Sequence, residues 1–293
     1  MACKTFAPHA FWNFAVPTVQ SLPRSKQRDG SRPQREDVMT ARRQLLPLAV
    51  LASGAAAMFA RIWHLNGGSF GYSMDDPYIH LALAEQIAHG HYGINSGELA
   101  APSSSVIWPF LLAPLSGLRV AEYGPLVINL LAAGATLAVL WSILDRAYGE
   151  RPGAKWAVPI LLIILIPCTN LLGLVFSGME HSLQVWLSVL MLWGVINEQP
   201  DTRPPWWLWA AIVAGPLVRY ECLALSLPSL AYLWLRGHRR AAATTAAVLA
   251  VCLGAFSLFL DQIGLGVLPH RFRRKASSFR VPSERMGWGS TCG

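Results

Sequence analysis

The chain has 293 residues, of which 53% are hydrophobic and only 14% charged, and its mean hydropathy is +0.37. These values exclude an ordinary soluble domain and predict an all-α integral membrane protein. The net charge is +8, but the basic residues fall mostly in the connections between apolar runs. We therefore expect membrane lipids, and not nucleic acid, as partners.

The N-terminal residues 1–43 are polar and basic, which predicts a disordered cytoplasmic tail. An alternative is that translation begins at Met39, directly before the first apolar run. That run, residues 44–60, has the length that a membrane span needs. The arginines before it predict a cytoplasmic N-terminus, so the next connection is expected on the extracytoplasmic side.

This first extracytoplasmic loop, residues 65–120, contains the adjacent carboxylates Asp75 and Asp76. Asp76 suits the N-cap, and Pro77 the first position, of an amphipathic helix over residues 77–89. The polar residues of that helix and of the turn after it are expected on the surface, including three histidines: His80, His89 and His91.

A second apolar helix is expected over residues 106–118. It is short for a span, and treating it as a span would place Arg146 and Lys155 outside, against the positive-inside rule. We therefore expect two juxtamembrane helices in the first loop.

The remaining apolar runs alternate across the membrane and bring the total to about seven transmembrane helices. The second to fifth spans are expected over residues 123–144, 156–176, 183–196 and 206–218; the sixth ends before Arg236, and the seventh covers residues 241–260. The transmembrane domain thus extends over residues 44–271. A basic tail, residues 272–293, follows; either it binds a phosphate-rich lipid surface or its reading frame is not native.

In this topology four sets of polar residues share the extracytoplasmic face. Ionisable groups at membrane level are costly and tend to mark function. An acid beside a helix N-terminus suits a general base or a metal ligand, and arginines clamp phosphate, so the sets suggest group transfer from an anionic, membrane-bound donor. They are Asp75 and Asp76; Glu180 and His181; Arg219 and Glu221; and His270, Arg271 and Lys275.

Several of these motifs resemble those of bacterial polytopic GT-C glycosyltransferases, over roughly residues 45–270. In the first loop they are Asp75-Asp-Pro-Tyr-Ile-His-Leu-Ala-Leu-Ala-Glu85, Gly90-His-Tyr-Gly-Ile-Asn-Ser-Gly-Glu98 and Pro102-Ser-Ser-Ser-Val-Ile-Trp108-Pro109. Later in the chain they are Ser177-Gly-Met-Glu180 and Leu217-Val-Arg219-Tyr-Glu221.

The resemblance implies a multi-pass enzyme of the bacterial inner membrane that uses a polyprenyl-phosphate-linked sugar at an extracytoplasmic active site. Asp75 would be the base for inverting transfer to an acceptor hydroxyl, and Asp76 would cap the helix or share a divalent metal, Mg or Mn, with Asp75. Arg219 would hold the donor phosphate. From their shared place on the extracytoplasmic face we also expect His270, Arg271 and Lys275 to bind the donor phosphate, and Glu180, His181 and Glu221 to bind other substrate groups.

The chain departs from the family pattern near its C-terminus. Related enzymes commonly carry Leu-Pro-Asn where this chain has Leu268-Pro-His270, and they continue for several more spans, so the resemblance implies a truncation. Two alternatives remain open: an inactive fragment of such an enzyme, and a transporter or flippase for lipid-linked saccharides. A transporter would keep charges near the bilayer midplane, whereas these motifs are expected at span ends.

Overall fold

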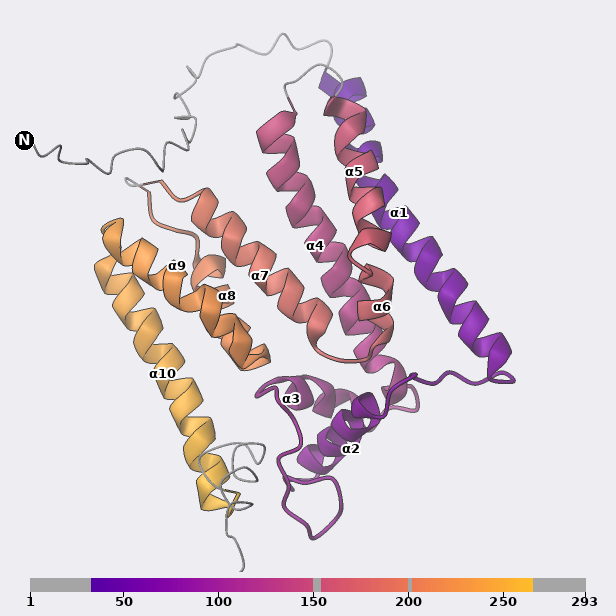
Figure 1. The fold of residues 1–293 in the computed structure, drawn as a ribbon, viewed down its shortest axis with the longest axis vertical. Coiled ribbons are helices and arrows are strands. Elements are labelled where there is room, and N and C mark those ends of the chain that lie inside the picture. The colour runs from indigo at the N-terminus through magenta and orange to yellow at the C-terminus, as the bar shows by residue number, and fades with distance from the viewer. Residues whose placement is uncertain (1–32, 150–153, 200–201, 266–293) are drawn as a thin grey trace, which may run out of the picture. The chain divides into compact units, whose positions relative to one another are not determined.

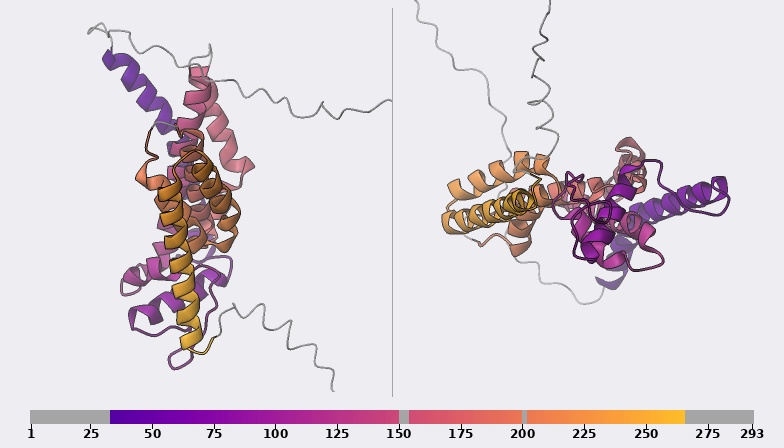
Figure 2. Two further views of the ribbon diagram at one scale, coloured as in Figure 1. Left: turned by 90° about the vertical axis from the view of Figure 1, so that its left-hand side faces the viewer. Right: turned by 90° about the horizontal axis from the view of Figure 1, so that it is seen from below.

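A computed structural model describes residues 33–149, 154–199 and 202–265, which divide into two units at Met39 and Thr40. Every described element is helical, as the sequence predicts (Figures 1 and 2). The α-helices are α1 (Pro33–Leu65), α2 (Asp76–Ala88), α3 (Trp108–Leu112), α4 (Gly124–Tyr148), α5 (Ala154–Cys168), α6 (Leu171–Phe176), α7 (His181–Ile196), α8 (Trp206–Val218), α9 (Leu223–Leu235) and α10 (Arg239–Gln262). Single 3₁₀ turns are η1 (Ala113–Leu115), η2 (Ala121–Tyr123) and η3 (Tyr220–Cys222).

Three helical segments of the described chain are long and apolar enough to cross a membrane: Arg42–Leu65, Ala121–Tyr148 and Arg239–Gln262. The other expected spans correspond to shorter apolar helices, among them α7 with 16 residues and α8 with 13. At 1.5 Å per residue these are shorter than the roughly 30 Å hydrocarbon core. Helix α1 begins at Pro33, within the segment expected to be a tail.

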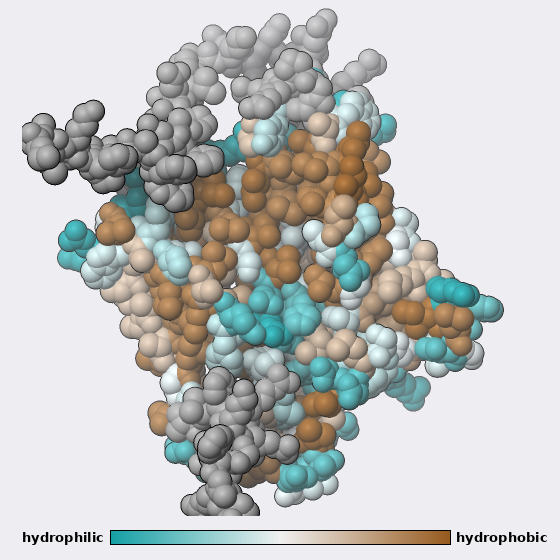
Figure 3. All heavy atoms as spheres, viewed as in Figure 1, coloured by the Kyte–Doolittle hydropathy of each residue, from teal (hydrophilic) through white to brown (hydrophobic). Residues whose placement is uncertain are grey.

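The helices expose large apolar side chains, which a soluble protein avoids in such number. Leu131 on α4 and Val251 on α10 are each 68% exposed. In Figure 3, hydrophobic surface covers most of the helices on the viewed face, and hydrophilic surface gathers at its middle and towards its lower end. This distribution fits helices surrounded by lipid.

The expected third span, residues 156–176, is interrupted. Helix α5 ends at Cys168 after Pro167, and Asn170 adopts a left-handed conformation with φ of 50° before α6 begins at Leu171. Asparagine tolerates this conformation better than most residues. The side chain of Asn170 also folds over Gly173, where a Cβ atom would lie 2.4 Å from its amide nitrogen.

Two hydrophobic cores hold the bundle together. One joins α1, α4, α5 and α6 around Leu137 and Leu162, and the other joins α7, α8, α9 and α10 around Met191 and Leu233. Helix α4 packs on α7 and so connects the two cores. Close approach of α7 and α8 depends on Gly194, where a Cβ atom would lie 2.6 Å from Leu208.

The connections after α7 and after α9 meet at one end of the bundle through the buried carboxylate of Glu198. It accepts hydrogen bonds from Arg236 Nε at 2.7 Å, His238 Nε2 at 2.9 Å and Tyr232 Oη at 3.3 Å. Burial would raise the pKa of Glu198, but the hydrogen bonds from Arg236 and His238 outweigh it and lower the pKa. We call this the Glu198 end.

The long connection between α1 and α4, residues 66–123, lies at the opposite end with α2 and α3 (Figure 1). Helix α2 agrees with the predicted helix over residues 77–89. The second predicted helix, residues 106–118, is only α3 followed by η1, so it does not reach the length of a span. The turns after α6 and α8 lie at this same end, which we call the Glu180 end (Figure 1).

Candidate functional site

Helix α2 begins one residue earlier than predicted, so the two adjacent carboxylates take different positions at its start. Asp76 is the first residue of α2, and Asp75 occupies the N-cap position with φ of −82° and ψ of −28° but makes no side-chain capping bond. The backbone carbonyl of Asp75 accepts the amides of Tyr78 at 3.0 Å and Ile79 at 3.2 Å. The side chain of Asp75 is exposed and that of Asp76 half-buried, so Asp75 is the carboxylate more open to a ligand.

A tyrosine fixes the segment that leads into α2. Tyr72 donates its backbone N–H to the Tyr78 hydroxyl at 2.8 Å. Its own hydroxyl donates to the Glu122 carbonyl at 2.7 Å and accepts the Leu126 amide at 3.1 Å. Burial raises the pKa of Tyr72, which keeps this hydroxyl a donor at any ordinary pH. The start of α2 is thereby attached to the start of α4.

The Ser177–Glu180 turn packs directly against this segment. Gly178 has a φ of 69°, and a Cβ atom there would lie 2.7 Å from Pro77 Cγ and 2.8 Å from Tyr72 Cε1. The side-chain amide of Asn129 on α4 attaches the turn to that helix by donating to the Met179 carbonyl at 2.7 Å. The acidic first-loop motif and the Ser177–Glu180 motif are therefore neighbours in space.

The serine-rich segment after Pro102 docks on the end of α8. The backbone amides of Val106 and Ile107 donate to the Leu217 carbonyl at 2.9 and 3.1 Å. Ser105 Oγ accepts the Trp108 amide at 3.0 Å and so starts α3. This docking brings the segment beside Arg219, which follows α8.

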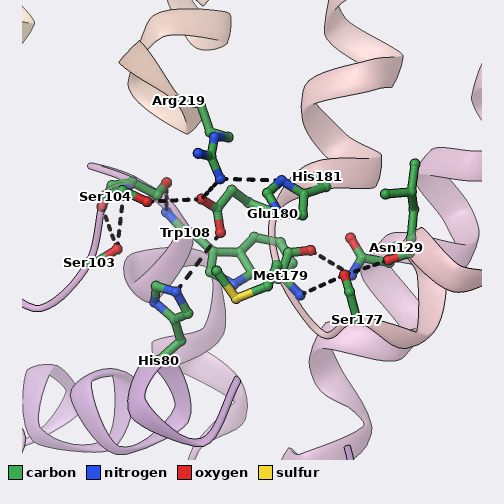
Figure 4. A network of polar contacts seen from close by, with 12 residues as sticks. His80, Ser103, Ser104, Trp108, Asn129, Ser177, Met179, Glu180, His181 and Arg219 are labelled. Carbon is green, nitrogen blue, oxygen red and sulfur yellow. Dashed lines mark hydrogen bonds and ion pairs between the residues drawn. The ribbon is translucent and has the colours of Figure 1, made fainter. Parts of the chain in front are cut away.

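The carboxylate of Glu180 lies where these segments converge (Figure 4). Its side chain is fully buried. Oε1 accepts a hydrogen bond from Arg219 Nη1 at 3.2 Å and one from Ser104 Oγ at 3.4 Å. Oε2 has no hydrogen-bond partner among the described residues and lies 3.9 Å from His80 Nε2. A buried carboxylate with one unpaired oxygen is costly, and Arg219 supplies the compensating charge.

Arg219 is almost saturated with contacts. Besides Glu180, its Nη1 contacts His181 Nδ1 at 3.2 Å, while Nη2 and Nε donate to the two oxygens of Glu221 at 2.9 and 3.3 Å. The hydrogen bonds from Arg219 lower the pKa of Glu221. Glu221 is 62% exposed, so Arg219 has one partner that is accessible to solvent, and it is a surface carboxylate.

His80 contradicts its expected place on the surface, because its side chain is only 4% exposed. It lies on the buried face of α2 with Pro77, Leu83 and Ala84. Burial lowers the pKa of His80; the nearby carboxylates of Glu180 and Asp76 oppose this shift, and Arg219 adds to it. The i, i+3, i+6, i+7 spacing of Pro77, His80, Leu83 and Ala84, which puts them on one face of a helix, is the sequence signal that would have placed it inside.

The structure thus joins Glu180, His181, Arg219 and Glu221 in one network of contacts at the Glu180 end of the bundle, and the start of α2, with Asp75 and Asp76, packs beside it. Sequence reasoning missed His80, Ser104 and Asn129 as members of this network. His270, Arg271, Lys275 and the tail 272–293 lie outside the described residues. Comparison of the chain with protein-family models, with curated proteins and with solved structures found no match.

Proposed function

We propose that this chain is a membrane glycosyltransferase of the GT-C type, which transfers a sugar from a polyprenyl-phosphate donor to an acceptor. The observation that carries the proposal is the meeting of three segments around the Ser177–Glu180 turn: the start of α2, the serine-rich segment with Ser104, and the Arg219–Glu221 motif. A cluster that holds an exposed carboxylate, a cation and a buried anion beside lipid-facing helices suits the transfer of a group from an anionic lipid.

The proposed topology has seven spans, made of the three long helices together with α5–α6, α7, α8 and α9. Basic residues of the described chain at the Glu198 end include Arg42, Arg43, Arg146, Lys155, Arg203, Arg236, Arg239 and Arg240. By the positive-inside rule this end is cytoplasmic, and the Glu180 end faces outward from the bacterial inner membrane. Reporters inserted after Asn66 and after Gly149 should report opposite sides; the same side for both would contradict this orientation.

In the proposed reaction, the Asp75 carboxylate takes the proton of the acceptor hydroxyl. The acceptor oxygen attacks the anomeric carbon of the donor sugar, the bond to the phosphate oxygen breaks, and polyprenyl phosphate leaves with the bonding electrons. Attack opposite the leaving group inverts the anomeric carbon. The acceptor is a glycan, lipid or protein with a free hydroxyl group.

The residues present suit a divalent metal only together with the substrate. Within the described ranges no group of three or more His, Cys, Asp or Glu side chains is arranged to hold one. Magnesium, however, is commonly bound by one or two carboxylates plus substrate phosphate oxygens, which Asp75 and Asp76 match. Such an ion, Mg or Mn, would neutralise charge on the leaving phosphate.

We infer separate roles for the residues around Arg219. Glu180 is fully buried and so positions Arg219. His181 does the same, because its Nδ1 contacts Nη1 of Arg219. A donor phosphate would reach Arg219 by replacing Glu221, the partner on the exposed side. His270, Arg271 and Lys275 remain proposed phosphate ligands because of their basic side chains and their expected place on the same face of the membrane.

The test of this function is a transfer assay on the purified full chain in lipid vesicles. Polyprenyl-phosphate-linked hexose or pentose should yield a glycosylated product, and the corresponding nucleotide sugars should not. Turnover with nucleotide sugars alone would contradict the proposed donor class. Movement of the intact lipid-linked sugar across the vesicle membrane without product would favour a flippase.

A further inference from the structure

A groove lies between α1, α4 and α5, away from the Glu180 network. It has a volume of about 240 Å³ and is lined mainly by apolar side chains, with Leu137 and Leu162 belonging to the buried core beneath it. Polar lining atoms come from Gln44 on α1 and Ser142 on α4, both of which are exposed. The groove therefore has an apolar depth and a polar rim.

Basic residues continue each of the three helices from this groove towards the Glu198 end. Arg43 lies one turn before Pro47 on α1, Arg146 one turn after Ser142 on α4, and Lys155 two turns before Leu162 on α5. One acidic residue, Asp145, lies at a similar distance from the groove, one turn after Trp141 on α4. These helix segments thus carry three positive charges and one negative charge within two turns of the lining residues.

Two buried donors at this groove have no hydrogen-bond partner among the described residues. One is Nε1 of Trp141, a lining residue that is 7% exposed; the other is Nε of Arg43, whose guanidinium lies 5.1 Å above the Trp156 ring. Unpaired buried donors are rare and commonly indicate a missing acceptor. A phosphodiester would supply such acceptor oxygens beside Arg43.

We propose that this groove binds an anionic phospholipid. One acyl chain fills the space between Leu48, Leu137 and Leu162, and the phosphate lies at the rim near Arg43, Arg146 and Lys155. Basic pockets between transmembrane helices are a known way to hold anionic headgroups. This site is independent of the proposed glycosyl transfer, because none of its residues belongs to the Glu180 network.

The test is native mass spectrometry of the purified full chain in detergent, with added phosphatidylglycerol or phosphatidylcholine of the same acyl chains. Phosphatidylglycerol should bind more tightly. The triple variant Arg43→Gln, Arg146→Gln, Lys155→Gln should weaken its binding roughly tenfold to a hundredfold, since each basic residue near a membrane surface contributes about 1 kcal/mol.

A matched triple variant controls for the general charge of this end. Arg203→Gln, Arg239→Gln, Arg240→Gln removes the same charge from residues outside the three helices of the groove, and it should leave phosphatidylglycerol binding within about twofold. Ala138→Trp, which fills the groove from α4, should reduce binding of both lipids. Equal binding of the two lipids by the wild type, equal weakening by both triple variants, or unchanged binding by Ala138→Trp would overturn the proposal.

Discussion

At the level of single residues, solvent exposure decides the role of each carboxylate that pairs with Arg219. Glu180 and Glu221 both pair with Arg219, but the first is fully buried and the second is 62% exposed. The sequence alone grouped all three as substrate ligands, because it contains no information on which carboxylate the fold encloses. Their separate roles, positioning for Glu180 and exchange with a phosphate for Glu221, depend on burial.

Removing Arg219 should destabilise the protein far more than removing Glu221. Arg219→Gln leaves the Glu180 carboxylate buried without its cation, which costs about 3 kcal/mol, whereas Glu221→Gln removes a surface pair worth about 1 kcal/mol or less. Denaturant unfolding of both variants in detergent measures the difference. Equal losses of unfolding free energy would show that the Glu180 contact is not the stronger one.

His80 should make stability depend on pH. Its folded-state pKa is lowered, so protons bind the unfolded chain more readily; its contribution is complete above the unfolded pKa of about 6.5 and is lost as the pH falls below that value. The facing groups are Glu180, Asp76 and Arg219. Thermal unfolding from pH 7.5 to pH 5 should lose less stability in His80→Gln than in the wild type.

The exposed His89 at the end of the same helix provides the control for this titration. His89→Gln is the matched variant, with the same substitution at the protein surface and outside the Glu180 network. A His80→Gln variant with the wild-type slope would show that the histidine is already protonated in the folded protein.

Among the elements, the length of the apolar runs and the polar or proline residues at their ends predicted most helices but not the interruptions within them. The predicted span over residues 206–218 coincides with α8, since Pro205 precedes it and Arg219 follows it. The break at Asn170 was not predicted, because a left-handed residue inside an apolar run leaves no periodic signal. The contact between Pro77 and Gly178 joins residues about a hundred positions apart, which one sequence does not reveal.

That contact predicts a large effect of Gly178→Ala. The added methyl group would lie 2.7 Å from Pro77 in a backbone conformation that favours glycine, and we expect a loss of about 1–3 kcal/mol of stability with reduced transfer activity. Gly117→Ala is the matched control, since a Cβ atom there has no neighbour within 4 Å. Comparable thermal stability of the two variants would exclude close packing of the two motifs.

At the scale of the whole molecule, the helices separate two kinds of polar end. The Glu198 end carries basic turns around one buried carboxylate, and the Glu180 end carries the acidic motif at Asp75 together with the Arg219 network. The sequence predicted this separation through the alternation of apolar runs and basic turns. It did not predict that only three described helices have the full length of a span.

Turnover of a polyprenyl-phosphate sugar by the full chain with Asp75→Asn tests the proposed glycosyl transfer most directly. Loss of the proposed base should lower the rate by about 10²–10⁴-fold, whereas Glu85→Gln, an exposed acid on the same helix, should remain within about twofold of the wild type. Wild-type turnover in Asp75→Asn would remove the base from the mechanism. No turnover of any polyprenyl-phosphate sugar by the wild type would contradict the proposed activity itself.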